Sequence, residues 1–102
     1  MATIFAEELT APEFADFVDG ETVGILPVGA IEPHGPHLPL STDCDIARGH
    51  LLHLGDYVAE ETNVLILPLQ TVGHSIEHSG FPGVFSHDAE SLAYAVQYLV
   101  PL

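Results

Sequence analysis

Carboxylate and imidazole side chains gather in one short, proline-rich stretch of the chain, I-E-P-H-G-P-H-L-P-L-S-T-D at residues 31–43. If Glu32 to His34 is extended, these two side chains point to the same side of the backbone. Asp43 follows at the start of a predicted helix and can supply a third ligand atom. Carboxylate oxygen and imidazole nitrogen together suit zinc, manganese or a similar divalent ion. We therefore predict a metal site formed by Glu32, His34 and Asp43.

Three prolines make this loop stiff. Pro33, Pro36 and Pro39 each restrict the preceding residue to an extended or polyproline conformation. A stiff loop fixes the positions of ligands before a metal binds. The same spacing is also typical of a polyproline ligand for an adaptor domain, but the flanking basic residue of many such ligands is absent and buried strands surround the segment.

Each candidate ligand has a simpler explanation as well. Glu32 and His34 could belong to an ordinary polar loop above a sheet edge. Asp43 could be favoured only by the dipole in the first turn of a helix. His37 is either a ligand or a partner that orients a carboxylate ligand.

A second loop also carries side chains that could bind a metal or take part in catalysis: His74, Ser75, Glu77 and His78. These residues follow the second predicted strand, so they should face the same crevice as the first loop. A serine, a histidine and a carboxylate could form a hydrolytic triad. However, Ser75 lacks the strained turn of a G-x-S-x-G motif, and metal-type ligands stand beside it.

Helical and strand patterns alternate along the chain. Thr10 to Glu13 has the spacing of a capping box and starts a short helix that ends near Gly20. Apolar runs at 22–28 and 63–69 predict strands buried on both faces of a parallel sheet. Further helices are predicted from about 42–44 onward, with 44, 47, 51, 54 and 58 on one face, and around 92–99. This order predicts an α/β fold with a parallel sheet flanked by helices.

The charge balance excludes some partners. Of the 102 residues, one is Lys or Arg and 15 are Asp or Glu, which gives a net charge of −14. Such a surface repels phosphate backbones, so we expect no nucleic-acid binding. Acidity of this kind is typical of proteins from concentrated salt, which screens self-repulsion. An ordinary acidic domain with basic residues elsewhere in a longer chain is the alternative.

The remaining ligand-type residues carry no predicted role. Cys44 is the only cysteine, so no internal disulfide forms, and Asp43 and Asp45 beside it disfavour a thiolate. No apolar run has the length of a membrane span, and no signal peptide is recognisable. We therefore expect a cytoplasmic protein without membrane contact. His50, His53 and His87 are assigned no role.

Two long motifs resemble the signatures of the creatininase (creatinine amidohydrolase) family. The first is E-P-H-G-P-H-L-P-L-S-T-D at 32–43, preceded by I-L-P-V-G at 25–29, and the second is H-S-I-E-H-S-G-F-P-G at 74–83. Both occur in the order typical of the family. The resemblance implies a creatininase-like α/β/α sandwich, of which residues 1–102 form the N-terminal portion, with about two strands and three helices.

The resemblance also implies roles for individual residues. Glu32, His34 and Asp43 correspond to metal ligands, with Asp43 bridging two divalent ions of zinc, manganese or iron. The second motif shapes the substrate pocket, which implies a substrate-binding role for Ser75. Glu77 and His78 are the local candidates for catalytic proton transfer. The family's remaining ligands and its general acid have no counterpart in this sequence.

The expected activity is hydrolysis of carbon–nitrogen bonds. A small-molecule amide, cyclic amide or formamide is the expected substrate, and the full-length protein is expected to form a homo-oligomer. Creatinine, a formamide precursor and a peptide all remain open as substrates. The alternative is an inactive fragment, or a partner-binding subunit that keeps part of the metal site.

Overall fold

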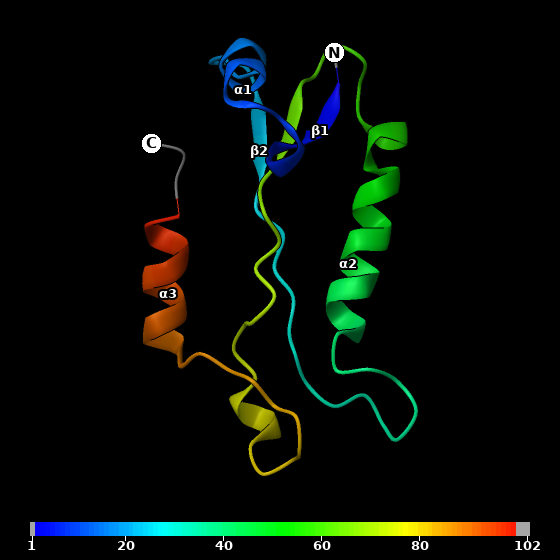
Figure 1. Cartoon of the computed structure of the whole chain (residues 1–102), viewed down its shortest axis with the longest axis vertical. Helices are drawn as coiled ribbons and strands as arrows, with labels where there is room; N and C mark the ends of the chain where they lie inside the picture. The colour runs from blue at the N-terminus through cyan, green and yellow to red at the C-terminus, as the bar shows by residue number, and fades with distance from the viewer. Residues whose placement is uncertain (1, 100–102) are drawn as a thin grey trace.

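A small parallel sheet occupies one end of the molecule, and its central strand comes last in the sequence (Figure 1). The computed structural model describes residues 2–99. Its strands are β1 (Thr3–Phe5), β2 (Val23–Ile25) and β3 (Val64–Ile66), in the spatial order β1-β3-β2. The α/β class with a parallel sheet is confirmed. The sheet has one strand more than the two predicted, because β1 is a three-residue strand with no periodic pattern.

The two predicted strands differ in burial. All three residues of β3 are buried, as their apolar run predicts. In contrast, β2 lies at the sheet edge and Val23 is 48% exposed, so the prediction of burial on both faces is wrong for β2. Both strands are shorter than the apolar runs, because Pro27 and Pro68 lack the N–H that a ladder needs.

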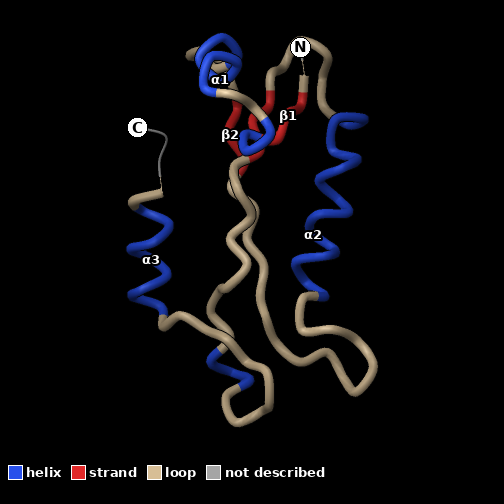
Figure 2. Tube along the Cα trace, in the orientation of Figure 1, coloured by secondary structure: helices blue, strands red, loops and turns tan. Residues whose placement is uncertain are grey.

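Of the three α-helices, α1 (Ala11–Phe17) lies beside the sheet, and α2 (Thr42–His53) and α3 (Ala89–Gln97) lie on either side of the loops that extend from it (Figure 2). The predicted capping box is present, since Thr10 Oγ1 accepts from the Glu13 N–H and Glu13 Oε1 accepts from the Thr10 N–H. Within residues 2–99 no helix has the length and apolar character needed to cross a membrane. Single 3₁₀ turns lie at η1 (Ala6–Glu8), η2 (Leu54–Tyr57) and η3 (Ile76–His78).

Two long loops leave the carboxyl ends of β2 and β3 and run side by side (Figure 2). The Gly29 N–H donates to the Gln70 carbonyl at 2.8 Å, and the Gln70 N–H donates to the Pro27 carbonyl at 3.0 Å. Further along, the Phe85 N–H donates to the Ile31 carbonyl at 3.0 Å. These backbone bonds hold the two ligand-bearing loops against each other.

Glycine permits the closest approach between these loops. A Cβ atom on Gly73 would lie 2.6 Å from the carbonyl oxygen of Gly29, which is far inside van der Waals contact. On its other side, Gly29 faces Cys44, whose Sγ would lie 2.6 Å from a Cβ on Gly29. Cys44 is buried and free, and its thiol donates to the carbonyls of Ala30 and Thr71 at 3.5 Å. The cysteine therefore packs both loops onto α2.

A carboxylate caps α3. The Ser91 N–H donates to Asp88 Oδ1 at 2.7 Å, which holds the pKa of Asp88 below its usual value. A lowered folded-state pKa adds stability above the unfolded value of about 3.9, and this stability is lost as the pH falls through the lower folded value. Below about pH 4 we expect helical circular dichroism to fall more steeply in the wild type than in Asp88→Asn, whose amide caps at any pH. Parallel pH curves for the two proteins would contradict this role.

Candidate metal centre

The structure brings together the three ligands predicted in the first loop. Each of Glu32, His34 and Asp43 offers one ligand atom, and these atoms lie within 4.8 Å of one another. Glu32 and His34 come from the loop after β2, and Asp43 comes from the first turn of α2. All three side chains are partly buried. The donor set of two carboxylates and one imidazole is one that divalent zinc or manganese accepts.

Two hydrogen-bond-length contacts fix the imidazole of His34. Its Nδ1 lies 3.0 Å from the carbonyl oxygen of Glu32, and its Nε2 lies 3.0 Å from Asp43 Oδ1. A carbonyl oxygen can only accept, so Nδ1 carries a proton and donates. The Glu32 carbonyl and, next, the Asp43 carboxylate raise the pKa of His34 above its usual value, against partial desolvation. The ring is thus held with Nε2 as the atom that can face a metal.

Asp43 lies in the first turn of its helix without capping it. The N-cap of α2 is Ser41, which makes no side-chain capping bond, and Thr42 Oγ1 donates to the Pro39 carbonyl at 2.6 Å. The helix dipole favours a carboxylate at this position, as the simpler explanation requires. In addition, Asp43 Oδ1 lies 3.0 Å from His34 Nε2. The first turn of α2 therefore presents the carboxylate to the loop.

The second loop contributes a neighbouring cluster that shares Glu32. Ligand atoms of Glu32, Glu77 and His78 also lie within 4.8 Å of one another. His78 Nε2 is 3.6 Å from Glu32 Oε2 and 3.8 Å from Glu77 Oε1. The Glu32 side chain is 14% exposed, whereas that of Glu77 is 62% exposed. Glu32 is therefore the largely buried carboxylate on which both loops converge.

Long-range hydrogen bonds place the turn that carries His78. The Ser75 N–H donates to Ser86 Oγ at 2.8 Å, and the His78 N–H donates to the Ser75 carbonyl at 3.0 Å. Ser75 is 1% exposed, and its hydroxyl oxygen has no hydrogen-bond partner among the described residues. No histidine within residues 2–99 therefore activates Ser75, which agrees with the rejection of a serine triad.

Other histidines lie away from the cluster. His37 is exposed and forms no hydrogen bond or ion pair within the described part of the chain. His50 and His53 lie on the exposed side of α2, where His53 Nδ1 is 4.0 Å from Asp56 Oδ2. The histidine that approaches the Glu32 carboxylate is therefore His78. The sequence had suggested His37 for a partner of this kind.

A cavity of about 300 Å³ adjoins this centre. The sequence alone did not indicate every residue that lines it. Pro33, Gly35 and His78 line it together with Phe81, which is largely exposed. The only sequence signal for Phe81 was an aromatic residue between Gly80 and Pro82 in a polar loop. The cavity places an apolar wall beside the Glu32 carboxylate.

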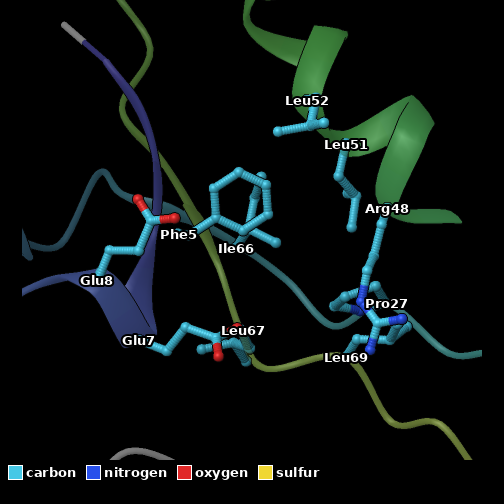
Figure 3. Close-up of a pocket in the computed structure, with 10 residues that line it drawn as sticks. All are labelled: Phe5, Glu7, Glu8, Pro27, Arg48, Leu51, Leu52, Ile66, Leu67 and Leu69. Carbon is cyan, nitrogen blue, oxygen red and sulfur yellow. The ribbon is translucent and has the colours of Figure 1, made fainter. Parts of the chain in front are cut away.

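Another cavity, of about 250 Å³, lies elsewhere in the fold (Figure 3). It opens between η1, β3 and α2, and none of the candidate ligands lines it. Its wall is largely apolar, with Glu7 and Glu8 on one side and Arg48 on the other (Figure 3). The chemistry predicted for the two loops therefore does not involve this cavity.

Comparison with known proteins identifies relatives of the chain. The family model for creatininase, described as creatinine amidohydrolase, matches residues 7–101. A mycofactocin precursor peptide peptidase from Mycobacterium tuberculosis is 38% identical over 74 residues, which cover 67% of this chain and 30% of the relative. Creatinine amidohydrolase from Pseudomonas putida is 34% identical over 104 residues, which cover 96% of this chain and 38% of the relative.

Solved structures of creatininases are also similar to this chain. A mutant creatininase complexed with creatine superposes with a TM-score of 0.80 at 29% identity, covering 94% of this chain and 38% of the other. A mutant creatininase of the Zn-Zn type has a TM-score of 0.79 at 29% identity, covering 95% of this chain and 38% of the other. The chain thus spans roughly a third of the length of the curated relatives that it matches.

Proposed function

Since the chain belongs to the creatininase family, we propose that it forms the N-terminal, metal-binding portion of a hydrolase that cleaves carbon–nitrogen bonds. The bond would belong to an amide, a cyclic amide or a formamide. The observation that carries this proposal is the convergence of Glu32, His34 and Asp43 ligand atoms within 4.8 Å. A structural neighbour of the Zn-Zn type supports two divalent ions in the complete site.

The residues present fit a divalent ion. Glu32 and Asp43 would balance its charge, and His34 would offer Nε2 because the Glu32 carbonyl fixes the proton on Nδ1. Divalent ions held here would supply an acidified water and polarise the substrate carbonyl. We propose that Glu32, His34 and Asp43 would hold zinc, manganese or iron, and that Asp43 would contribute to both ions of the complete site.

The second loop would handle the substrate. A buried hydroxyl without a partner is costly, so the unpaired Ser75 oxygen supports a role in binding a polar substrate group after a small local opening. His78 lines the cavity beside Glu32, and Glu77 Oε1 lies 3.8 Å from its Nε2, so these two residues are the candidates to exchange protons with a leaving nitrogen.

The proposal also covers the substrate, the cellular location and the oligomeric state of the protein. A creatininase complexed with creatine supports a small-molecule amide as substrate, and a relative that is a peptide peptidase supports a peptide as the alternative. We propose a cytoplasmic protein adapted to high salt, given its charge of −14 and its single free cysteine. The complete protein would be a homo-oligomer.

Metal content and turnover test the proposal together. The full chain, purified in high salt, is expected to retain zinc or manganese, measured per chain by mass spectrometry. Hydrolysis is then assayed on creatinine, small formamides and short peptides before and after removal of metal by a chelator. Metal-dependent release of an amine or of an acid product supports the hydrolase. Bound metal without turnover of any substrate supports the alternative of a partner-binding subunit, and absence of metal contradicts the proposed metal site and supports the alternative of an inactive fragment.

A further inference from the structure

The carboxylate of Glu32 needs a neighbouring hydrogen-bond donor to fix its orientation in the candidate metal centre. Its side chain is 14% exposed. Its backbone is fixed, because the Glu32 N–H donates to the Leu40 carbonyl and the Glu32 carbonyl accepts from His34 Nδ1. Within residues 2–99, however, its carboxylate accepts no hydrogen bond. A largely buried carboxylate without a donor is unfavourable, and its orientation is poorly defined.

His78 is the residue that lies close enough to offer the Glu32 carboxylate an N–H donor. Its Nε2 lies 3.6 Å from Glu32 Oε2, a few tenths of an ångström beyond a hydrogen bond and within ion-pair distance. The same nitrogen is 3.8 Å from Glu77 Oε1, but Glu77 is 62% exposed and water screens that contact. Of the two carboxylates beside His78, the buried Glu32 therefore interacts more strongly.

The position of His78 depends on the second loop as a whole. The turn η3 is fixed by the Ser75 N–H bond to Ser86 and closes when the Phe81 N–H donates to the His78 carbonyl at 3.2 Å. The loop is in turn held to the first one at Gly29 and Ile31. The imidazole thus reaches Glu32 from the second loop, whose position against the first loop is set by these backbone bonds.

We propose that His78 is a positioning residue for Glu32: it orients the carboxylate from the second loop so that an oxygen is presented to the metal. This inference rests on the proposed metal site. It is distinct from the proton-transfer role, because it acts before any substrate binds and needs an N–H donor at the position of Nε2. A metal ligand commonly requires such an outer partner.

Zinc affinity of three variants tests the inference in the full chain. His78→Leu removes the donor and is expected to weaken zinc binding about 10- to 100-fold. His78→Gln places an amide N–H near the position of Nε2 and should stay within about threefold of the wild type. His37→Leu, the same change at an exposed histidine of the first loop, should have no effect. Circular dichroism of each variant checks that it is folded.

The outcomes separate this inference from the proposed function. If His78→Gln binds zinc as weakly as His78→Leu, His78 is a direct ligand and the positioning role is wrong. If His78→Leu binds zinc like the wild type, the role is also wrong, although the metal site stands. If the wild type binds no zinc, both the metal site and this role fail.

A metal-free measurement tests the contact itself. The ring ¹⁵N signals of His78 should shift in Glu32→Gln, because the nearest carboxylate of the ring has lost its charge. The ring ¹⁵N signals of His37 should stay unchanged in the same variant and serve as the internal control. Unmoved His78 signals would overturn the inference whatever the zinc affinity.

Discussion

Replacing Asp43 by Asn is expected to lower zinc affinity more than about 100-fold, a larger loss than removal of an outer partner causes. The substitution keeps the shape of the side chain and removes one of the two negative charges. It would leave Glu32 and His34 as the two remaining protein donors of the cluster, fewer than the three that catalytic zinc sites use. A competition titration with a chromogenic chelator measures the change.

Asp45→Asn is the matched control for this prediction. Asp45 lies in the same first turn of α2, but it is exposed and accepts from Ser41 Oγ at 2.9 Å. Its loss removes the same charge from the same helix end, and it also removes the ion-pair partner of Arg48, whose Nη1 lies 3.7 Å from Asp45 Oδ1. Equal loss of zinc affinity in both would mean that only the overall charge matters and that Asp43 is not a ligand.

Gly73→Ala is expected to reduce the free energy of unfolding by about 1–3 kcal/mol, the usual cost of inserting a methyl group where no space exists. The added Cβ would lie 2.6 Å from the carbonyl oxygen of Gly29. That oxygen belongs to backbone and cannot rotate aside. Movement of Gly29 would also strain its N–H bond to Gln70 and its contact with Cys44. Urea unfolding followed by circular dichroism measures the effect.

The opposite sign is expected for Gly49→Ala. Gly49 lies inside α2, and a Cβ there would meet no atom within 4 Å. Alanine in a helix interior is favoured over glycine by about 0.5–1 kcal/mol. The two variants add the same methyl group, so an increase in the free energy of unfolding in Gly73→Ala as well would show that the loop contact does not limit stability.

The sequence was sufficient to predict which side chains of the first loop meet. The reason is local, because Glu32 and His34 are two residues apart in a proline-stiffened segment and Asp43 follows at a helix start. The parallel arrangement of β2 and β3 could also be predicted from two apolar runs separated by a helix.

Features set by distant residues could not be predicted in this way. An apolar run such as 22–28 does not reveal which strand lies at the edge, so the exposure of Val23 was missed. Likewise, the choice between His37 and His78 as the neighbour of Glu32 depends on the bond between Ser75 and Ser86 and on the pairing of the two loops. Such contacts join residues of different loops and leave no pattern in either segment alone.

The strand order β1-β3-β2 has a consequence for synthesis on the ribosome. The strand that both β1 and β2 need as a neighbour, β3, is the last of the three to be translated. At about 5–20 residues per second, β2 and the loop that follows it wait roughly 2–8 s for Val64 to Ile66 to appear. During that interval the apolar strand has no sheet to join, and the nascent chain exposes it to chaperones and to neighbouring nascent chains. The ligands of the first loop are therefore complete in sequence well before they are held in place.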